Sequence, residues 1–400
     1  MGGPGVALLF AGTLLAAAGY GSTFLLADHF RALGGSEVDV GRTLAGAVAG
    51  TLIGVPAVGW SGARFGGARL ACLGSLLLAL GYFLLASLAS LSWLTVAAGL
   101  LIGLGWGTFY LAAPMAVSER VTNDNRGFWF TRFGAFQMAG IGGGPMVALL
   151  LASQFQVAPA TIFRFVAVGC CIAAACLLAF ESLLPRPRPN GNQGNTQGAT
   201  TTAQNPNWIL SLGTIARTRA VYPIVMVGLG ACVFTGMMTF QSSLVRGTGL
   251  NPGLYFTVYA VVVVVARFVL AATIARADGD KASTVLLILM STGVLAMFAI
   301  DVGLPVQIAS AVLLALGYGL VYTVIQTQAV NDAPEQHRNG ALTWFVISYF
   351  IGIFGFPVIG GWLIVAAGTT AFMALVLACA TLELLVAEIR RRDTRRPASK

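Results

Sequence analysis

Residues 104–110 read Leu-Gly-Trp-Gly-Thr-Phe-Tyr, and residues 316–322 read Leu-Gly-Tyr-Gly-Leu-Val-Tyr. The two segments are 212 residues apart (316 − 104) and share Leu, two Gly and the final Tyr. The same offset pairs Arg64 with Arg276 and Pro145 with Pro357. Coincidence among helices of similar composition is the alternative, but one offset that serves both loops and helices favours an internal duplication.

The composition indicates what surrounds this duplicated unit. Of the 400 residues, 57% are hydrophobic and only 9% are charged, whereas soluble proteins carry about 25% charged residues. Lipid is the solvent that suits so much apolar surface. We expect twelve membrane helices, at 6–27, 40–60, 69–90, 93–117, 128–152, 162–184, 220–243, 254–275, 283–301, 304–329, 341–366 and 370–388.

The offset moves each helix to the one six places later, so paired helices run in the same direction and the repeats are parallel. The sequence predicts an all-α membrane protein whose solute site lies near the bilayer midplane, between the halves. The predicted parts are an N-terminal six-helix bundle (1–184), a flexible cytoplasmic linker rich in Pro, Gly, Asn, Gln and Thr (185–219), a C-terminal six-helix bundle (220–389) and a basic cytoplasmic tail (390–400).

The charge distribution predicts the orientation. The formal net charge is +9, and with the N-terminus inside most Lys and Arg residues fall in cytoplasmic loops or in the tail. The exceptions are Arg31, Arg42, Arg164, Arg246 and Arg267. By the positive-inside rule we expect a multi-pass protein of a bacterial inner membrane with both termini in the cytoplasm.

Two motifs resemble signatures of the major facilitator superfamily. Its loop signature, Gly-x-x-x-Asp-Arg-x-Gly-Arg/Lys-Arg/Lys, is matched at Gly59, Arg64 and Gly66, but Ala63 replaces the Asp. The second half keeps Arg276 and has Ala275 at the Asp position. In the family this Asp helps to latch the cytoplasmic ends of the halves, so its absence puts the latch in doubt.

The second motif resembles the core of the family's exporter signature, Gly-x-x-x-Gly-Pro-x-x-Gly-Gly. Gly140, Gly144 and Pro145 match its start, and Pro357, Gly360 and Gly361 match its end in the second half. Glycines let a neighbouring backbone approach closely and Pro permits a bend. Ordinary helix packing through Gly is the alternative to an exporter role.

Polar and aromatic residues within the apolar runs are candidates for solute binding, because pockets combine apolar walls with a few polar groups. Trp106 and Tyr318 are further aromatic walls, and simple packing is the alternative for each residue. The candidates are Tyr20, Phe24, Tyr110, Gln137, Gln241, Tyr322, Gln326 and Tyr349.

Ionisable residues in the membrane are costly and are therefore candidates for coupling. Asp28 and His29 could exchange protons or could form a solvated helix end. Arg132 begins the fifth helix, and Arg267 could bind an anion or hold a neighbouring helix through carbonyl groups. We expect Glu383 to snorkel toward the tail near Arg390.

Soluble-type enzyme signals are missing from the sequence. It has no phosphate loop, only two histidines and no spaced metal ligands. We expect no enzyme activity, no cofactor or metal and no nucleic-acid partner. We expect a monomeric secondary transporter working by alternating access, which exports a small organic solute in exchange for protons. Uptake of a sugar or organic acid, and a non-transporting sensor or assembly factor, are the alternatives.

Overall fold

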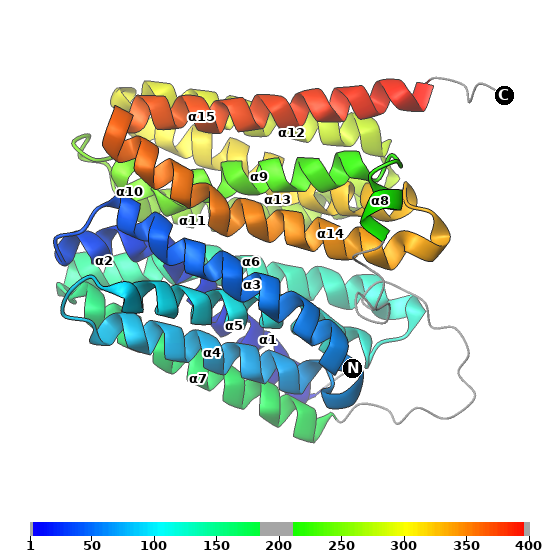
Figure 1. Cartoon of the computed structure of the whole chain (residues 1–400), viewed down its shortest axis with the longest axis horizontal. Coiled ribbons are helices and arrows are strands. Elements are labelled where there is room, and N and C mark those ends of the chain that lie inside the picture. Colours follow the sequence, from blue (N-terminus) through cyan, green and yellow to red (C-terminus); the bar gives the residue numbers. More distant parts are fainter. Residues whose placement is uncertain (1–2, 185–210, 396–400) are drawn as a thin grey trace. The chain divides into compact units, whose positions relative to one another are not determined.

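The computed structural model describes residues 3–184 and 211–395, and every regular element in these ranges is a helix (Figure 1). Most of the predicted linker therefore lies outside the described residues. The chain divides into two compact units, which are described separately here. Unit 1 contains Met1–Thr23 and Arg42–Gln204, and unit 2 contains Phe24–Gly41 and Asn205–Lys400.

Unit 1 is a bundle of long apolar helices. Within it α4 packs against both α5 and α7, and α1 packs against α6 and α7. Its helices are α1 (Pro4–Gly21), α3 (Glu37–Phe65, from Arg42 onward), α4 (Gly67–Ser87), α5 (Trp93–Ser118), α6 (Asn123–Phe155) and α7 (Pro159–Leu183).

Unit 2 repeats this arrangement and also holds the segment Phe24–Gly41. The α15 ribbon lies along α12 (Figure 1) and also packs against α9. Its elements are α2 (Leu26–Ala32), the start of α3, α8 (Ser211–Ile215), α9 (Val221–Thr239), α10 (Gln241–Leu244), α11 (Pro252–Arg276), α12 (Gly279–Ala296), η2 (Met297–Val302), α13 (Leu304–Asn331), η3 (Glu335–His337), α14 (Arg338–Phe350), the π-helical turn η4 (Ile351–Gly355) and α15 (Phe356–Arg395).

Local signals place the helix ends. Ser92, Asn251 and Asp278 accept backbone N–H groups at the starts of α5, α11 and α12, which satisfies donors that have no partner inside a helix. Gly66 has φ +82° between α3 and α4, a conformation in which a side chain is strained. These signals explain why one apolar run ends and the next begins within a few residues.

The helix boundaries confirm the internal repeat. A shift of 212 moves Gly67, the first residue of α4, onto Gly279, the first residue of α12 (67 + 212 = 279). The same shift moves Trp93 at the start of α5 onto Pro305, the second residue of α13. The third and fourth long helices of the two units therefore begin at equivalent positions of the repeat.

Eleven candidate membrane spans are found among the described residues, and the last one, Gly340–Asp393, has 54 residues. At 1.5 Å per residue that length is far more than one crossing of a hydrocarbon core of about 30 Å. Gly368 interrupts it with φ 83° and ψ 174°. The stretch is thus two crossings, in agreement with the twelve helices expected from the sequence.

Two segments differ from the sequence-based ranges. The short helix α8 falls in the predicted flexible linker, yet Ile215 is buried beside Ala220, Ala333 and Ala341. This apolar contact orders the last part of the linker on unit 2. Helix α15 continues to Arg395, so the first residues of the predicted tail extend the last membrane helix.

Candidate functional site

Unit 1 buries an aromatic cluster between α1 and α5. The rings of Tyr20 and Trp106 stack with centroids 4.3 Å apart, and Tyr110 lies 5.9 Å from Trp106. Tyr20 and Trp106 are fully buried. The indole nitrogen of Trp106 has no hydrogen-bond partner among the described residues. Its N–H group is therefore an unsatisfied donor.

Close backbone packing brings α6 onto α1 beside this cluster. A Cβ at Gly140 would overlap the carbonyl oxygen of Leu14, and one at Gly144 would lie 2.5 Å from that of Ala18. The predicted close approach of a neighbouring helix is confirmed at both glycines. Gln137 lies one turn before Gly140 and is buried, and its amide nitrogen has no hydrogen-bond partner in the described chain.

Unit 2 has an aromatic stack at the equivalent place. The rings of Phe234 and Tyr318 are 4.6 Å apart and nearly parallel, and Tyr318 is the repeat partner of Trp106 (106 + 212 = 318). Phe24 meets Phe234 edge-on at 5.8 Å. Both units therefore carry stacked rings between their first and fourth long helices.

A second aromatic group in unit 2 joins two of the predicted residues. Tyr322 on α13 lies 5.6 Å from Tyr349 and 5.4 Å from Phe345, both on α14. Gln326 is half-buried one turn after Tyr322. Tyr110 and Tyr322 thus lie at equivalent repeat positions but have different ring partners.

Gln241 is the most isolated of the predicted amides. Its side chain is fully buried at the start of α10, and neither amide atom has a hydrogen-bond partner in the described ranges. A buried amide without partners costs free energy unless something else satisfies it. Gln241 is therefore a candidate contact for a polar group of a solute.

A network of charges ties Phe24–Gly41 to the rest of unit 2. One carboxylate oxygen of Glu37 accepts from Arg246 at 2.6 Å, from Ser243 at 2.7 Å and from Arg31 at 3.3 Å. Arg31 also pairs with Asp28 at 3.0 Å. No motif in the sequence points to Glu37, and the sequence places Arg246 only among the charges outside the predicted cytoplasmic loops and tail.

Asp28 and His29 lie in different surroundings although they are adjacent. Asp28 accepts hydrogen bonds from Ser242 at 2.7 Å and from Arg31. His29 is buried, with its ring 5.7 Å from that of Phe30. Asp28 thus belongs to an ionic network, and His29 to the apolar interior of unit 2.

The two predicted arginines also differ. Arg267 donates from Nε and Nη2 to the carbonyl oxygen of Gly319, at 3.2 and 3.1 Å, which matches the carbonyl-holding alternative. Arg132 is exposed, with its guanidinium 4.0 Å from the ring centroid of Phe128.

The loop-signature residues lie at the predicted cytoplasmic ends of α3 and α11. Arg64 and Arg276 are exposed, and Gly59 is half-buried. At the position after Gly66, the backbone N–H of Gly67 donates to Glu119 at 3.0 Å. This contact joins α4 to the end of α5 within unit 1.

The second-half motif packs against the start of α3. A Cβ at Gly361 would overlap the carbonyl oxygen of Glu37, and one at Gly41 would lie 2.8 Å from that of Pro357. Gly360 lies against Phe372, with 2.8 Å between the ring and a Cβ built there. The motif glycines in both units are therefore sites of close helix approach.

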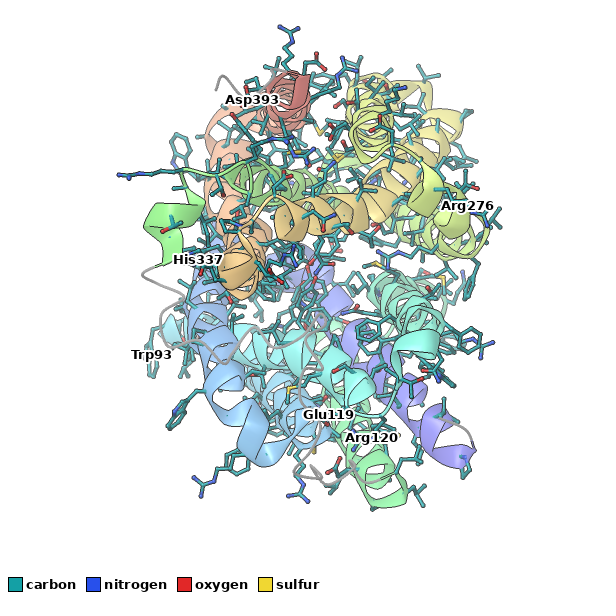
Figure 2. The ribbon with its side chains drawn as sticks, turned by 90° about the vertical axis from the view of Figure 1, so that its right-hand side faces the viewer. Trp93, Glu119, Arg120, Arg276, His337 and Asp393 are labelled. Atoms are coloured by element: carbon teal, nitrogen blue, oxygen red, sulfur yellow. The ribbon has the colours of Figure 1, made fainter. Side chains whose placement is uncertain are left out.

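Each unit has an ion-pair cluster at its predicted cytoplasmic end. In unit 1, Arg120 pairs with Glu181 and, at 3.1 Å, with Glu119. Figure 2 shows Glu119 and Arg120 side by side at the end of α5. In unit 2, Arg390 pairs with Asp280 and, at 2.8 Å, with Asp332.

Three solved structures share the fold. An auto-inhibited POT family peptide transporter is 14% identical, with a TM-score of 0.69 and coverage of 100% of this chain and 98% of that one. The POT family transporter PepTSo is 14% identical, with a TM-score of 0.74 and coverage of 98% and 99%. A structure described for substrate recognition in proton dependent oligopeptide transporters is 15% identical, with a TM-score of 0.71 and coverage of 97% and 98%.

The sequence comparisons identify the family. No curated protein is similar enough in sequence to match this chain. The sequence profile of the Major Facilitator Superfamily, however, matches residues 8–357 and 253–400. This chain, with its duplicated helical bundles, therefore belongs to the Major Facilitator Superfamily and is an integral membrane secondary transporter, not an enzyme.

Proposed function

We propose that this transporter moves a small amphipathic organic solute outward, driven by a proton gradient, by alternating access. The observation that carries the proposal is that each unit holds both stacked aromatic rings and buried polar atoms that have no hydrogen-bond partner among the described residues. These atoms are the Trp106 indole nitrogen, the Gln137 amide nitrogen and both amide atoms of Gln241. Such groups suit a solute with a flat apolar body and a few neutral polar groups.

The shortage of buried charge argues for this solute class. Among the described residues of unit 1, the buried charged side chains are Glu181 and Arg120, which pair with each other at one end of the bundle. A zwitterionic solute needs opposite charges fixed inside the protein, because burying an unpaired charge is costly. The predicted solute-binding residues are aromatic or amide in type.

The outward direction rests on the exporter-like motif. Gly140 and Gly144 press α6 onto the backbone of α1, the helix that carries Tyr20. A helix that packs this closely and contains Pro145 is suited to transmit bending to the aromatic cluster.

Proton-driven uptake of a peptide is the second candidate. Its motivation is that the three solved structures above are described as peptide transporters or proton dependent oligopeptide transporters. Identities of 14–15% support the fold alone, so the peptide substrate is an alternative rather than an inference from this chain's own side chains.

Vesicle transport separates the two candidates. Purified protein would be reconstituted and given a pH gradient of either sign, with a panel of amphipathic drugs, sugars, organic acids and dipeptides. We expect gradient-dependent accumulation of an amphipathic solute in the direction of antiport, and weaker transport by Trp106→Ala. Accumulation of dipeptides together with protons would favour the second candidate, and movement of nothing in the panel would count against both.

A further inference from the structure

A buried carboxyl group on α15 has no role in the interactions described above. The side chain of Glu383 is 0% exposed, and neither carboxylate oxygen has a hydrogen-bond partner among the described residues. Charged groups are rarely buried in this way unless they are paired.

The expectation that Glu383 snorkels toward Arg390 is wrong. Arg390 is held by Asp280 and Asp332. It also lies seven residues further along the helix, about 10 Å by helical rise. With its nearest arginine engaged elsewhere, Glu383 stays within the bundle of unit 2.

The carboxyl group rests on the bare backbone of α9. A Cβ built at Gly230 would lie 2.9 Å from each carboxylate oxygen of Glu383. A side chain at position 230 would therefore shift the carboxyl group, which is the flexible end of Glu383. The space for Glu383 is therefore shaped by α9 as well as by α15.

The titratable neighbours of Glu383 are two thiols. Cys232 on α9 and Cys379 on α15 lie within hydrogen-bonding reach of each other, and both interact with Glu383. Helix α12 also packs against α15, but its charged residues, Asp280 and Lys281, lie in its first turn, where Asp280 is taken by Arg390. The segments η2 and η4 contribute only Asp301, which is exposed.

The described residues therefore provide no cation for a carboxylate at this place. An ionised carboxyl group without a partner or water is expensive in a membrane protein interior. A protonated carboxyl group carries no charge and fits the same space. Release of the proton then requires α9 and α15 to separate enough for water to enter.

The equivalent place in unit 1 has no carboxyl group. The offset of 212 relates Glu383 to Cys171, which is exposed on α7, while the adjacent Cys170 is buried against Gly19 of α1. The α1–α7 interface thus contains the thiol of Cys170, whereas the α9–α15 interface contains the carboxyl group of Glu383.

From this geometry we infer that Glu383 is a proton-binding site of the transporter, which keeps its proton while α9 and α15 are packed together and exchanges it with water when they part. The inference rests on the proposed proton-coupled function and assigns that function its proton carrier.

Infrared spectroscopy of the purified protein in lipid tests the site without any solute. We expect a carbonyl band of a protonated carboxyl group at neutral pH that disappears in Glu383→Gln. The control Glu388→Gln removes a half-buried acid on the same helix, which is ionised in pairs with Arg391 and Arg392, and it should leave the band in place. Absence of a Glu383-dependent band overturns the inference.

The coupling is tested in the same vesicles as the proposed function. We expect Glu383→Gln to lose gradient-driven accumulation while keeping solute exchange at equal pH, since its neutral amide resembles the protonated acid. If Glu383→Gln does not fold, Glu383→Ala and Glu383→Leu, which also remove the carboxyl group, should show the same loss. Proton-driven accumulation unchanged in all folded variants overturns the inference. A Glu383 band without gradient-driven movement of any solute by the wild type refutes the proposed function and leaves the protonated site standing.

Discussion

Both units have a buried ion pair at the equivalent end of their helical bundle. The positive and negative residues of the pair lie on opposite helices in the two units. In unit 1 the cation Arg120 at the end of α5 meets the anion Glu181 on α7. In unit 2 the equivalent of Arg120 is the anion Asp332 (120 + 212 = 332), and it meets the cation Arg390 on α15. Coulomb attraction is the same for either order of charges, so the scaffold determines where the pair lies but not which helix is positive.

A second difference concerns the interior. The described part of unit 1 keeps its buried charges at one end, in the Arg120–Glu181 pair, whereas unit 2 also buries Glu37 and Glu383. Duplicated bundles can thus differ in their buried charges while they keep the same order of helices. The following substitutions compare the effects of equivalent changes in the two units.

The largest effect is expected from Arg390→Met. It leaves the carboxylates of Asp280 and Asp332 without their shared partner, and breaking a buried ion pair costs about 3–5 kcal/mol. Arg120→Met should cost less, because Arg69 lies 3.7 Å from Glu181. Thermal unfolding of the purified protein measures both. Arg392→Met, with a side chain 76% exposed, is the control and should change little. A larger loss for Arg120→Met than for Arg390→Met would contradict the comparison.

The next effect concerns close packing that both units share. Gly140 and Gly352 are related by the offset of 212, and a Cβ at either would overlap a backbone carbonyl of the first long helix of its unit, at Leu14 on α1 and Gly228 on α9. Overpacking costs about 1–3 kcal/mol, so Gly140→Ala and Gly352→Ala should lower stability to a similar degree. Gly143→Ala has open space within 4 Å and should be tolerated. An unchanged unfolding temperature in one of the two would show that its unit packs more loosely.

A smaller effect is expected on solute binding from the paired aromatic stacks. Trp106→Leu and Tyr318→Leu each remove a stacked ring, and such contacts are worth about 0.5–1.5 kcal/mol. Apparent solute affinity in the vesicle assay would tell which unit contributes more. Trp93→Leu at the exposed start of α5 is the control. Equal affinity in all three variants would mean that the stacked rings do not contribute to solute binding.

The smallest stability change is expected from Arg246→Ala, because its side chain is 55% exposed and exposed pairs contribute about 0–1 kcal/mol. Its consequence should instead appear in conformation. With its bond to Glu37 lost, a cysteine placed at Ser36 should react faster with a water-soluble thiol reagent. Ser36→Cys in the otherwise unchanged chain gives the reference rate, and identical rates would mean that the network does not hold the segment Phe24–Gly41.

Much of the fold could be predicted from the pattern of apolar residues and from the offset of 212. The helix order, the parallel repeat and the break near Gly368 follow from local signals, because a membrane helix must satisfy its own backbone groups within one segment. The same holds for the glycines at 140 and 144, whose lack of a side chain already implies a close neighbour.

Partners of individual side chains were decided by the tertiary structure. Nothing in the sequence near Glu383 indicates that Gly230 covers it or that Arg390 is engaged by Asp280 and Asp332. These contacts join residues up to 153 positions apart (383 − 230). The apolar periodicity predicts which face of a helix is buried. The partner of a charged side chain depends on which groups lie near it in space, and only the packed bundle sets those distances.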